Sequence, residues 1–201
     1  MTTSGTTAYD ECPDLPPLVA AAVAVARRAG FAQSCLPAQG RLLHTLAGGI
    51  GAGTIGETGT GCGVGLAWLA SGAAPDARLV SVERDPERAG IAAEVFAAEP
   101  RVRVRHGDWR DLRDDGPFDL LVLDGGGQGK GVEPPLDPGD WLRPGGVVVL
   151  DDFTPTTDWP PLHCGRPDTA RLYWLTHPRL HATEVRVTPT AATILARYLD
   201  R

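Results

Sequence analysis

Glycines at alternate positions follow a single acidic residue in the first third of this 201-residue sequence. Glu57 ends a short apolar run, and Gly59, Gly61, Gly63 and Gly65 come next. Glycine lets a backbone turn sharply and lets a ligand approach without obstruction by a Cβ atom. A carboxylate just before such a loop is unfavourable beside a pyrophosphate and favourable beside a cationic group. The segment therefore predicts a binding loop for a small ligand that carries positive charge.

The spacing of these glycines argues against two phosphate-binding loops. A dinucleotide loop follows the pattern G-x-G-x-x-G, but a count from Gly59 or Gly61 places valine or leucine at the third glycine position. A Walker loop follows G-x-x-x-x-G-K-S/T, and around Lys130 this pattern fails because Asp124 stands at the first glycine position. Neither a nucleoside triphosphate nor a dinucleotide is the ligand that these loops favour.

A second acidic side chain stands at the end of the next apolar run. Glu83 lies 24 residues past Gly59 and ends the segment LVSVE. A carboxylate in this place can accept hydrogen bonds from both hydroxyls of a ribose. The alternative is a surface glutamate that precedes a helix.

Three aspartates end two later apolar runs. Asp124 follows FDLLVL, and the pair Asp151 and Asp152 follows GGVVVL. If these runs are neighbouring parallel strands, their ends meet at the edge where ligands bind in open α/β folds. Carboxylates that converge there repel one another unless a cation neutralises them, and oxygen ligands of this kind suit Mg²⁺. The alternative is an acidic pair that caps and solvates a strand end.

Lys130 is the only lysine in a sequence that otherwise uses arginine for its basic side chains. Arginine stays protonated, whereas lysine can lose its proton when it is partly buried or lies near a cation. A retained lysine therefore suggests proton transfer or a compact point charge. The alternative is that the position of this one lysine has no functional meaning, and both interpretations stay open.

Glu57 and its glycine loop resemble the first motif of the class I S-adenosylmethionine-dependent methyltransferases, an acidic residue followed by G-x-G-x-G. From about residue 34 onward, the chain resembles the catechol O-methyltransferase-like bacterial O-methyltransferase family, through LPAQGRLLHTL and LRPGGVVVLDD among other segments. The resemblance implies that Asp108 and Trp109 contact the adenine, unless Asp108 only caps a short helix. The implied cofactor-binding residues are Glu57, Gly59, Thr60, Gly61, Gly63, Glu83, Arg84, Asp108, Trp109 and Asp124.

The same resemblance implies a metal and a catalytic pair. In that family an Asp after the fourth strand and an Asp-Asn pair after the fifth hold the metal, so Mg²⁺ would be bound by Asp124, Asp151 and Asp152. Asp152 departs from the family's Asn, and Lys130 lies six residues after Asp124 where the family's catalytic Lys follows after three. The implied catalytic residues are Lys130, which would take a proton, and Asp124.

The implied reaction is direct transfer of a methyl group to an oxygen nucleophile, a step that depends mainly on positioning. Small hydroxylated aromatic compounds are the implied acceptors. Trp159, His163 and Trp174 are candidates to line the acceptor pocket, although ordinary packing is the preferred interpretation for any one of them. Three alternatives remain: a metal-independent small-molecule methyltransferase of natural-product metabolism, a nicotinamide-dependent dehydrogenase, and a non-catalytic module that binds S-adenosylmethionine.

The elements that must position these residues alternate along the chain. Helices are predicted over 15–30, 37–46, 62–72 and 85–98, and strands over 53–57, 78–83, 101–106, 118–124 and 146–151. Two β-rich runs at the end, 179–188 and 191–199, predict an antiparallel pair. Such alternation predicts an α/β fold, a Rossmann-like doubly wound sheet of seven strands that is mostly parallel. Residues 1–14 are expected to form a flexible tail, and residues 15–201 a single domain.

Composition limits the partners and the location. The net charge of −6 argues against a nucleic-acid-binding surface, which needs clustered basic residues. No apolar run approaches the roughly 18 residues of a membrane span, and the first residues lack the features of a signal peptide. The four scattered cysteines suggest neither a zinc site nor disulfides. We expect a cytoplasmic protein with a small-molecule acceptor and no nucleic-acid or membrane partner, and a homodimer stays an open alternative to a monomer.

Overall fold

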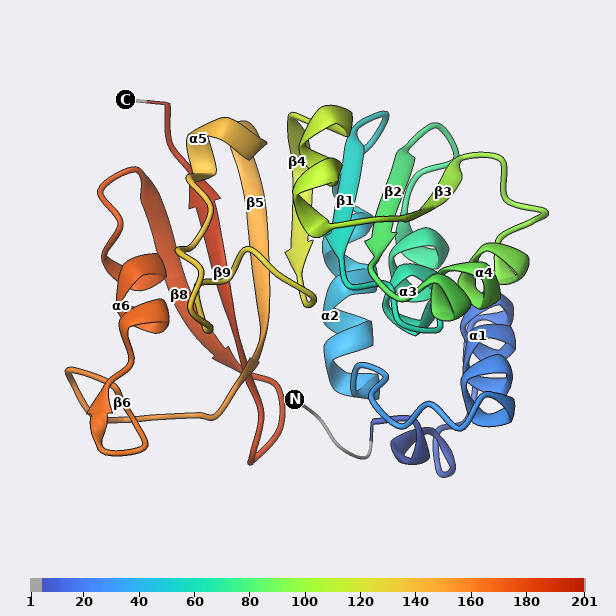
Figure 1. The fold of residues 1–201 in the computed structure, drawn as a ribbon, viewed down its shortest axis with the longest axis horizontal. Coiled ribbons are helices and arrows are strands. Elements are labelled where there is room, and N and C mark those ends of the chain that lie inside the picture. The colour runs from blue at the N-terminus through green and yellow to red at the C-terminus, as the bar shows by residue number, and fades with distance from the viewer. Residues whose placement is uncertain (1–4, 201) are drawn as a thin grey trace.

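The computed structural model of the chain describes residues 5–200 and has a seven-stranded sheet at its centre (Figure 1). The strands follow the order β3-β2-β1-β4-β5-β9-β8. Neighbours from β3 to β5 are parallel, and β9 is antiparallel to both β5 and β8. The strands of this sheet are β1 (Thr54–Thr58), β2 (Arg78–Glu83), β3 (Val102–His106), β4 (Phe118–Leu123), β5 (Leu142–Phe153), β8 (Leu180–Arg186) and β9 (Ala192–Tyr198). The predicted doubly wound, mostly parallel α/β fold is confirmed.

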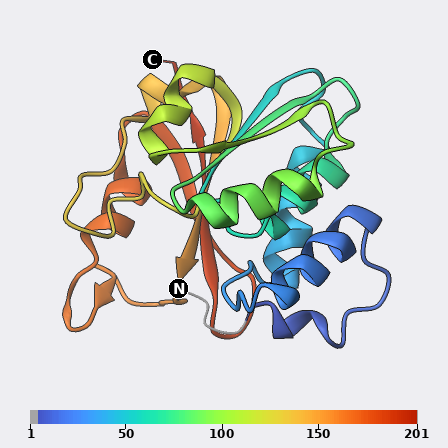
Figure 2. The ribbon, with the colours of Figure 1, turned by 45° about the vertical axis from the view of Figure 1, so that its right-hand side comes forward.

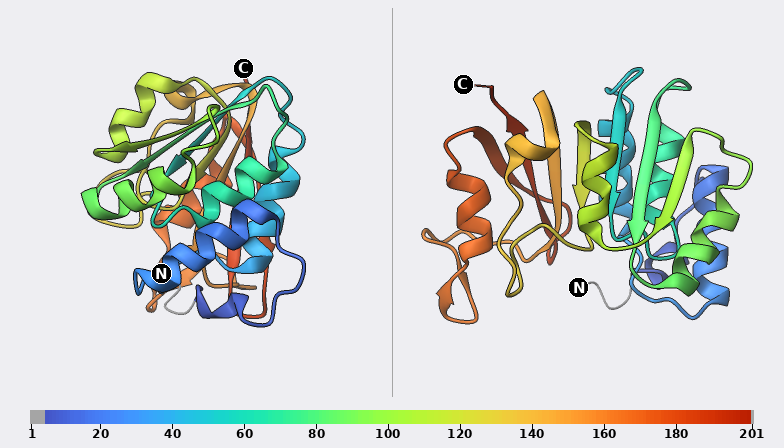
Figure 3. Two further views of the ribbon diagram at one scale, coloured as in Figure 1. Left: turned by 90° about the vertical axis from the view of Figure 1, so that its right-hand side faces the viewer. Right: turned by 45° about the horizontal axis from the view of Figure 1, so that its top comes forward.

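Helices lie on both faces of this sheet (Figures 2 and 3). Four of them carry proline in the first turn, where its missing N–H group is not needed for a helical hydrogen bond. The helices are α1 (Pro17–Arg28), α2 (Pro37–Ala47), α3 (Val64–Gly72), α4 (Pro86–Val95), α5 (Pro138–Trp141) and α6 (Thr169–Thr176), with 3-10 turns η1 (Thr7–Tyr9) and η2 (Trp109–Asp115). The four helices expected from the sequence are α1 to α4, with boundaries that shift by a few residues.

The central strand β4 is buried on both faces. Leu120 and Val122 belong to the apolar core that includes α1, α2 and α3, whereas Leu121 and Leu123 belong to the core on the other side, with Trp174 of α6. Successive residues of a strand point to opposite faces of the sheet, so this apolar run serves both cores.

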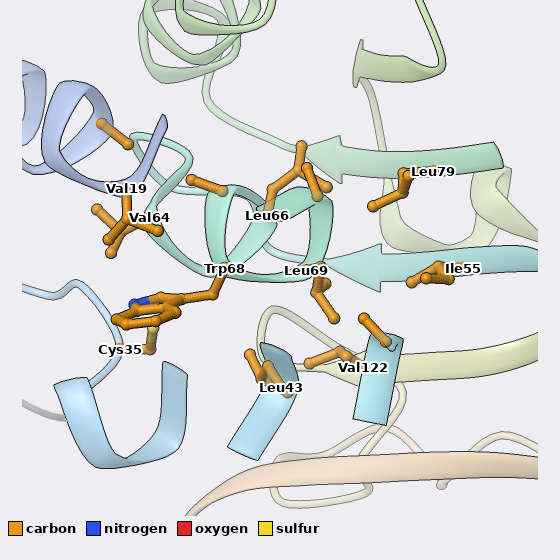
Figure 4. Close-up of a cluster of buried hydrophobic side chains, with 14 of the residues drawn as sticks. Val19, Cys35, Leu43, Ile55, Val64, Leu66, Trp68, Leu69, Leu79 and Val122 are labelled. Carbon is orange, nitrogen blue, oxygen red and sulfur yellow. The ribbon is translucent and has the colours of Figure 1, made fainter. Parts of the chain in front are cut away.

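The core around α3 fixes the start of that helix. Leu66 and Leu69 of α3 lie in one cluster with Leu43 of α2 and with Ile55 and Leu79 of the sheet (Figure 4). Full burial of each such side chain contributes roughly 1.5–3 kcal/mol. The glycine loop that leads from β1 into α3 is therefore held at both ends by buried elements.

The parallel strands end at one edge of the sheet, the lower edge in Figure 1. Ligands of open α/β folds bind at this edge. Beyond β5, an exposed two-stranded hairpin of β6 (Leu162–His163) and β7 (Arg166–Pro167) was not predicted. Within residues 5–200, no helix has the length and apolar character needed to cross a membrane.

The N-terminal segment packs against the domain from its first described residues. Tyr9 is only 3% exposed; its hydroxyl donates to the carbonyl oxygen of Cys35 at 3.0 Å and accepts from Trp68 Nε1 at 2.9 Å. The Thr6 and Ser34 hydroxyls are 2.8 Å apart and share a hydrogen bond. The prediction of a flexible tail over residues 1–14 is therefore wrong for Thr6 to Tyr9, because burial of an aromatic ring with a bonded hydroxyl holds this segment in place. Residues 1–4 lie outside the described part of the chain.

Candidate functional site

A cavity of about 500 Å³ opens at the carboxyl edge of the sheet, between the loops that follow β1 to β5. These loops come from distant parts of the sequence and meet because the strands are parallel neighbours. The predicted site residues that line the cavity are Glu57, Gly59, Thr60, Gly61, Glu83, Arg84, Asp108, Trp109, Asp124, Lys130, Asp151 and Asp152.

Glu57 is a buried carboxylate in the wall of this cavity. It is 2% exposed, and its Oε2 accepts a hydrogen bond from Ser81 Oγ at 2.6 Å. The Ser81 hydroxyl in turn lies 2.6 Å from the hydroxyl of Thr60. Burial raises the pKa of Glu57 to about 8, although the hydrogen bond from Ser81 lowers it. A cationic ligand in the cavity would reverse this shift, so the residue is a natural contact for positive charge.

Helix α3 begins directly against this carboxylate. A Cβ atom on Gly65 would lie 2.6 Å from Glu57 Oε1, so the absence of a side chain at Gly65 lets the two elements meet. Ser81 was not predicted as part of the site. Its signal in the sequence is a hydroxyl inside the apolar run LVSVE.

Gly59 allows the loops after β1 and β4 to touch. Its φ is +86°, and a Cβ atom there would lie 2.5 Å from the backbone of Gly125. The N–H groups of Asp124 and Gly125 both donate to the carbonyl oxygen of Thr58, at 3.1 and 2.6 Å. Asp124 is thereby fixed beside the glycine loop.

Gly63 has a different place from the other predicted glycines. With φ of +90° it precedes the first residue of α3, and a Cβ atom on it would meet the ring of Phe96 at 2.9 Å. It does not line the cavity. Gly63 turns the chain into the helix in a conformation that residues with a side chain rarely adopt, and its contact with the cofactor stays a prediction.

Glu83 ties the end of β2 to the glycine loop. Its two carboxylate oxygens accept from the N–H groups of Gly61 at 2.8 Å and Asp85 at 2.9 Å, and Arg88 Nη2 lies 3.2 Å from Oε1. A carboxylate has about four acceptor positions. A ligand hydroxyl can therefore use the remaining one or replace the contact with Arg88.

Asp108 caps η2, as the alternative interpretation expected. Its side chain accepts from the Arg110 N–H at 3.0 Å, and the Asp111 carboxylate accepts from the Asp108 N–H at 3.0 Å. The hydrogen bond from the Arg110 backbone, together with the Arg110 guanidinium, lowers the pKa of Asp108. The carboxylate therefore stays ionised while it lines the cavity.

Trp109 forms the wall of the cavity next to Asp108. A Cβ atom on Gly126 would lie 2.3 Å from its ring, and its Nε1 donates to Glu133 Oε2 at 3.3 Å. The ring centroid lies 5.7 Å from that of Trp141. This indole thus spans from the end of β3 to the loop after β4.

The glycine-rich loop after β4 is anchored to the end of β5. Lys130 Nζ donates to the carbonyl oxygens of Asp151 and, at 2.8 Å, of Asp152. The Gln128 side chain donates to the carbonyl oxygen of Asp151 at 3.4 Å, and the backbone carbonyl oxygen of Gln128 accepts from Trp174 Nε1 at 2.9 Å. Although Lys130 is exposed as a whole, burial of its ammonium group lowers its pKa, against the opposing effect of the nearby aspartates.

The three aspartates come together as predicted. Burial raises the pKa of Asp124 well above its usual range, and the charges of Asp151 and Asp152 add to this effect. Burial also raises the pKa of Asp151 to about 6, while the hydrogen bond from the Asp152 N–H at 2.7 Å lowers it.

These carboxylates are not arranged as metal ligands. Among residues 5–200 no group of three or more His, Cys, Asp and Glu side chains could hold a metal ion. The pairing of β5 with β9 shifts register between Leu150 and Phe153, and Asp152 has a φ of +63°. Such an irregularity re-aims side chains at a strand end, and here Asp151 turns to the N–H of Asp152. The residues do not fit Mg²⁺, so the predicted ligand set of Asp124, Asp151 and Asp152 is corrected.

A second cavity, of about 350 Å³, lies beyond Phe153. The Phe153 ring centroid is 3.9 Å from Lys130 Nζ and 5.0 Å from the guanidinium carbon of Arg171, which lines this second cavity. Buried Arg171 pairs with Asp168 at 3.1 Å and with Glu184 at 2.7 Å.

The three predicted acceptor-pocket residues separate in the structure. Trp159 lines the second cavity and is 66% exposed. His163 lies on the exposed β6, and Trp174 is fully buried. Trp174 packs in the core under the loop after β4, as the preferred packing interpretation expected, and does not line a pocket.

The sheet order, the antiparallel final pair and the acidic glycine loop at the end of β1 form the arrangement that the resemblance to class I methyltransferases implied. The comparisons with known proteins agree. Residues 57–153 match the family model described as a methyltransferase domain, which confirms the resemblance found in the sequence.

Relatives by sequence are named for O-methyl transfer. A provisionally named O-methyltransferase of Mycobacterium avium (strain 104) is 33% identical over 128 residues, which cover 57% of this chain and 54% of that protein. The chain thus spans about half the length of the relatives it matches.

Two solved structures share the fold over nearly the whole chain. The O-methyltransferase from Bacillus cereus in complex with SAH has a TM-score of 0.71 at 22% identity, and 98% of each chain is covered. The O-methyltransferase TomG from Streptomyces achromogenes, involved in tomaymycin synthesis and solved with SAM, has a TM-score of 0.72 at 22% identity, covering 98% of this chain and 96% of TomG.

Proposed function

We propose that this chain is an S-adenosylmethionine-dependent O-methyltransferase that acts on small hydroxylated acceptors. The observation that carries the proposal is the cavity in which buried Glu57 and Glu83 flank a glycine loop at adjacent strand ends. The matched methyltransferase domain and the relatives named for O-methyl transfer support it.

Each wall of the cavity suits one part of the cofactor. Glu57, whose ionisation is suppressed by burial, would contact the ammonium group. Glu83 would accept from the ribose hydroxyls, and Asp108 and Trp109 would meet the adenine amino group and ring. Thr60, Arg84 and the backbone at Gly59 and Gly61 complete the lining.

The catalytic end of the cavity is the one near β4 and β5. Asp124 and Lys130 are the proposed catalytic residues, because both line the cavity beside the strand ends. When bound, the cofactor supplies an activated methyl group on a sulfonium. The chain's task is to hold the acceptor oxygen in line with that group and to accommodate the proton that leaves the hydroxyl. Since the aspartates do not fit Mg²⁺, no metal enters this scheme.

Calorimetry with S-adenosylhomocysteine and with NAD⁺ tests the proposed cofactor. We expect binding of the first and none of the second. Methyl transfer from labelled S-adenosylmethionine to phenols, catechols and aliphatic alcohols then tests the reaction. Binding without transfer to any of these would instead support a non-catalytic module, and tight NAD⁺ binding would overturn the proposal.

A further inference from the structure

The ammonium group of Lys130 is fixed at the carboxyl end of β5. It donates to the carbonyl oxygens of Asp151 and Asp152 and lies 3.9 Å from the centroid of the Phe153 ring. Two hydrogen bonds and a cation–π contact determine its position, although the residue as a whole is exposed. The lysine ammonium is a compact point charge whose N–H groups can donate to two carbonyl oxygens at once.

This ammonium is the cation that the acidic end of the cavity needs. The negative charges of Asp152, Asp151 and Asp124 favour the protonated form of Lys130. In turn, the positive charge of Lys130 acts to lower the pKa of Asp124 and of Asp151. Three carboxylates in one place repel one another unless positive charge lies among them. The irregular end of β5 prevents the aspartates from supplying a metal-ligand set, yet it presents two adjacent carbonyl oxygens to the lysine.

We infer that Lys130 is the resident cation of this site and that it takes the place of a divalent metal. This inference rests on the proposed function. Lys130 then stays protonated through the reaction, and its charge stabilises the oxygen of the acceptor as the hydroxyl becomes an alkoxide. The oxygen forms a bond to the methyl carbon, the carbon–sulfur bond breaks with its electron pair on sulfur, and the hydroxyl proton passes to water. Lys130 is thus an electrostatic residue and not the proton acceptor.

Two variants separate a fixed charge from a base. Lys130→Arg keeps the charge but cannot release a proton near neutral pH, whereas Lys130→Met keeps the length and loses the charge. We expect Lys130→Arg to retain turnover within about tenfold of wild type, and Lys130→Met to lose about 100-fold or more, the scale of a lost electrostatic contact. Equal loss in both variants would overturn the inference and favour a base.

Divalent metals give a readout that does not depend on activity. We expect EDTA to leave wild-type turnover unchanged and MgCl₂ or MnCl₂ to leave its melting temperature unchanged. Because the aspartates do not supply a metal-ligand set, MnCl₂ should leave the melting temperature of Lys130→Met unchanged as well. Loss of wild-type turnover in EDTA, restored by Mg²⁺, would overturn the inference.

Because Lys130 is the only lysine, ¹⁵N labelling of lysine gives one side-chain signal in the wild-type protein. We expect that signal to report an ammonium at pH 8 with S-adenosylhomocysteine bound, and a neutral amine there would contradict the inference. Calorimetry keeps the two proposals apart. If S-adenosylhomocysteine does not bind wild type, the proposed function fails; if it binds all three proteins equally and the variants do not differ in turnover, only the role of Lys130 fails.

Discussion

The two halves of the carboxyl edge are built differently. At the ends of β1 and β2, regular strands lead into short loops, and Glu57 and Glu83 bond to groups on the adjacent strand or its loop. At the ends of β4 and β5, a register shift, a left-handed Asp152 and a long glycine-rich loop make the geometry irregular. The first half is a preformed wall. The second half depends on Lys130, which ties the loop after β4 to the end of β5, and on Trp174, which reaches that loop from α6.

This difference has a consequence for how each half responds to change. A regular strand end places its side chain through backbone pairing, so a substitution there changes ligand contacts more than it changes the fold. An irregular end depends on tertiary support, so a substitution in the supporting element changes the fold first.

The largest effect should come from the support of the second half. Trp174→Ala removes a fully buried indole and leaves the carbonyl oxygen of Gln128 without its donor. We expect the free energy of unfolding, measured in urea, to fall by about 3–5 kcal/mol. The matched control is Trp159→Ala, which removes an exposed indole and should change stability by less than about 0.5 kcal/mol. Similar losses of unfolding free energy in both variants would show that the second half does not depend on support from Trp174.

Glu57→Gln should make stability depend less on pH. The pKa of Glu57 is about 8 in the folded chain against a usual 4.5, so the folded state holds a proton that the unfolded state releases between these values. Wild type therefore loses stability as pH rises from 5 to 8, by on the order of 2–4 kcal/mol from this group alone. Urea unfolding at pH 5, 6.5 and 8 should show that the free energy of unfolding of the variant rises relative to that of wild type as the pH increases. If the difference in free energy of unfolding between the two proteins did not change with pH, the raised pKa of Glu57 would be contradicted.

Glu83→Ala should weaken cofactor binding with a smaller effect on the fold. The variant removes the acceptor proposed for the ribose hydroxyls and frees the Gly61 N–H. Charge-assisted hydrogen bonds are worth about 1.5–3 kcal/mol, so affinity for S-adenosylhomocysteine should fall by on the order of tenfold or more. Calorimetry would check this, with Glu87→Ala in the first turn of α4 as control. A change below about twofold would show that the carboxylate only shapes the loop.

The smallest effect should come from the N-terminal segment. Tyr9→Phe removes the hydroxyl that bonds to Trp68 Nε1 and to the carbonyl oxygen of Cys35. A buried N–H left without a partner costs about 1–2 kcal/mol, which thermal unfolding would detect. Cys35 also lines the cavity, so affinity for S-adenosylhomocysteine should fall slightly. An unchanged melting temperature would show that this segment does not support the wall.

Much of this protein follows from the sequence alone. Apolar runs of strand length, separated by helical stretches with proline near their starts, predicted every strand of the main sheet and helices α1 to α4. Because parallel strands end at one edge, the same pattern predicted that Glu57, Glu83 and Asp124 meet there. These results depend on local periodicity and on chain direction, which the order of residues encodes.

Other features were decided only by tertiary structure. The burial of Tyr9, the hydrogen bond between Ser81 and Glu57, and the reach of Lys130 to the end of β5 each join segments far apart in the chain. The predicted Mg²⁺ ligand set was wrong because of the register shift in β5, and no pattern of residues in the sequence predicts that shift. Sequence periodicity determines on which face of a strand or helix a side chain lies. Packing between elements determines where the charged group at the end of that side chain lies. The chemistry of this site depends on the positions of those charged groups.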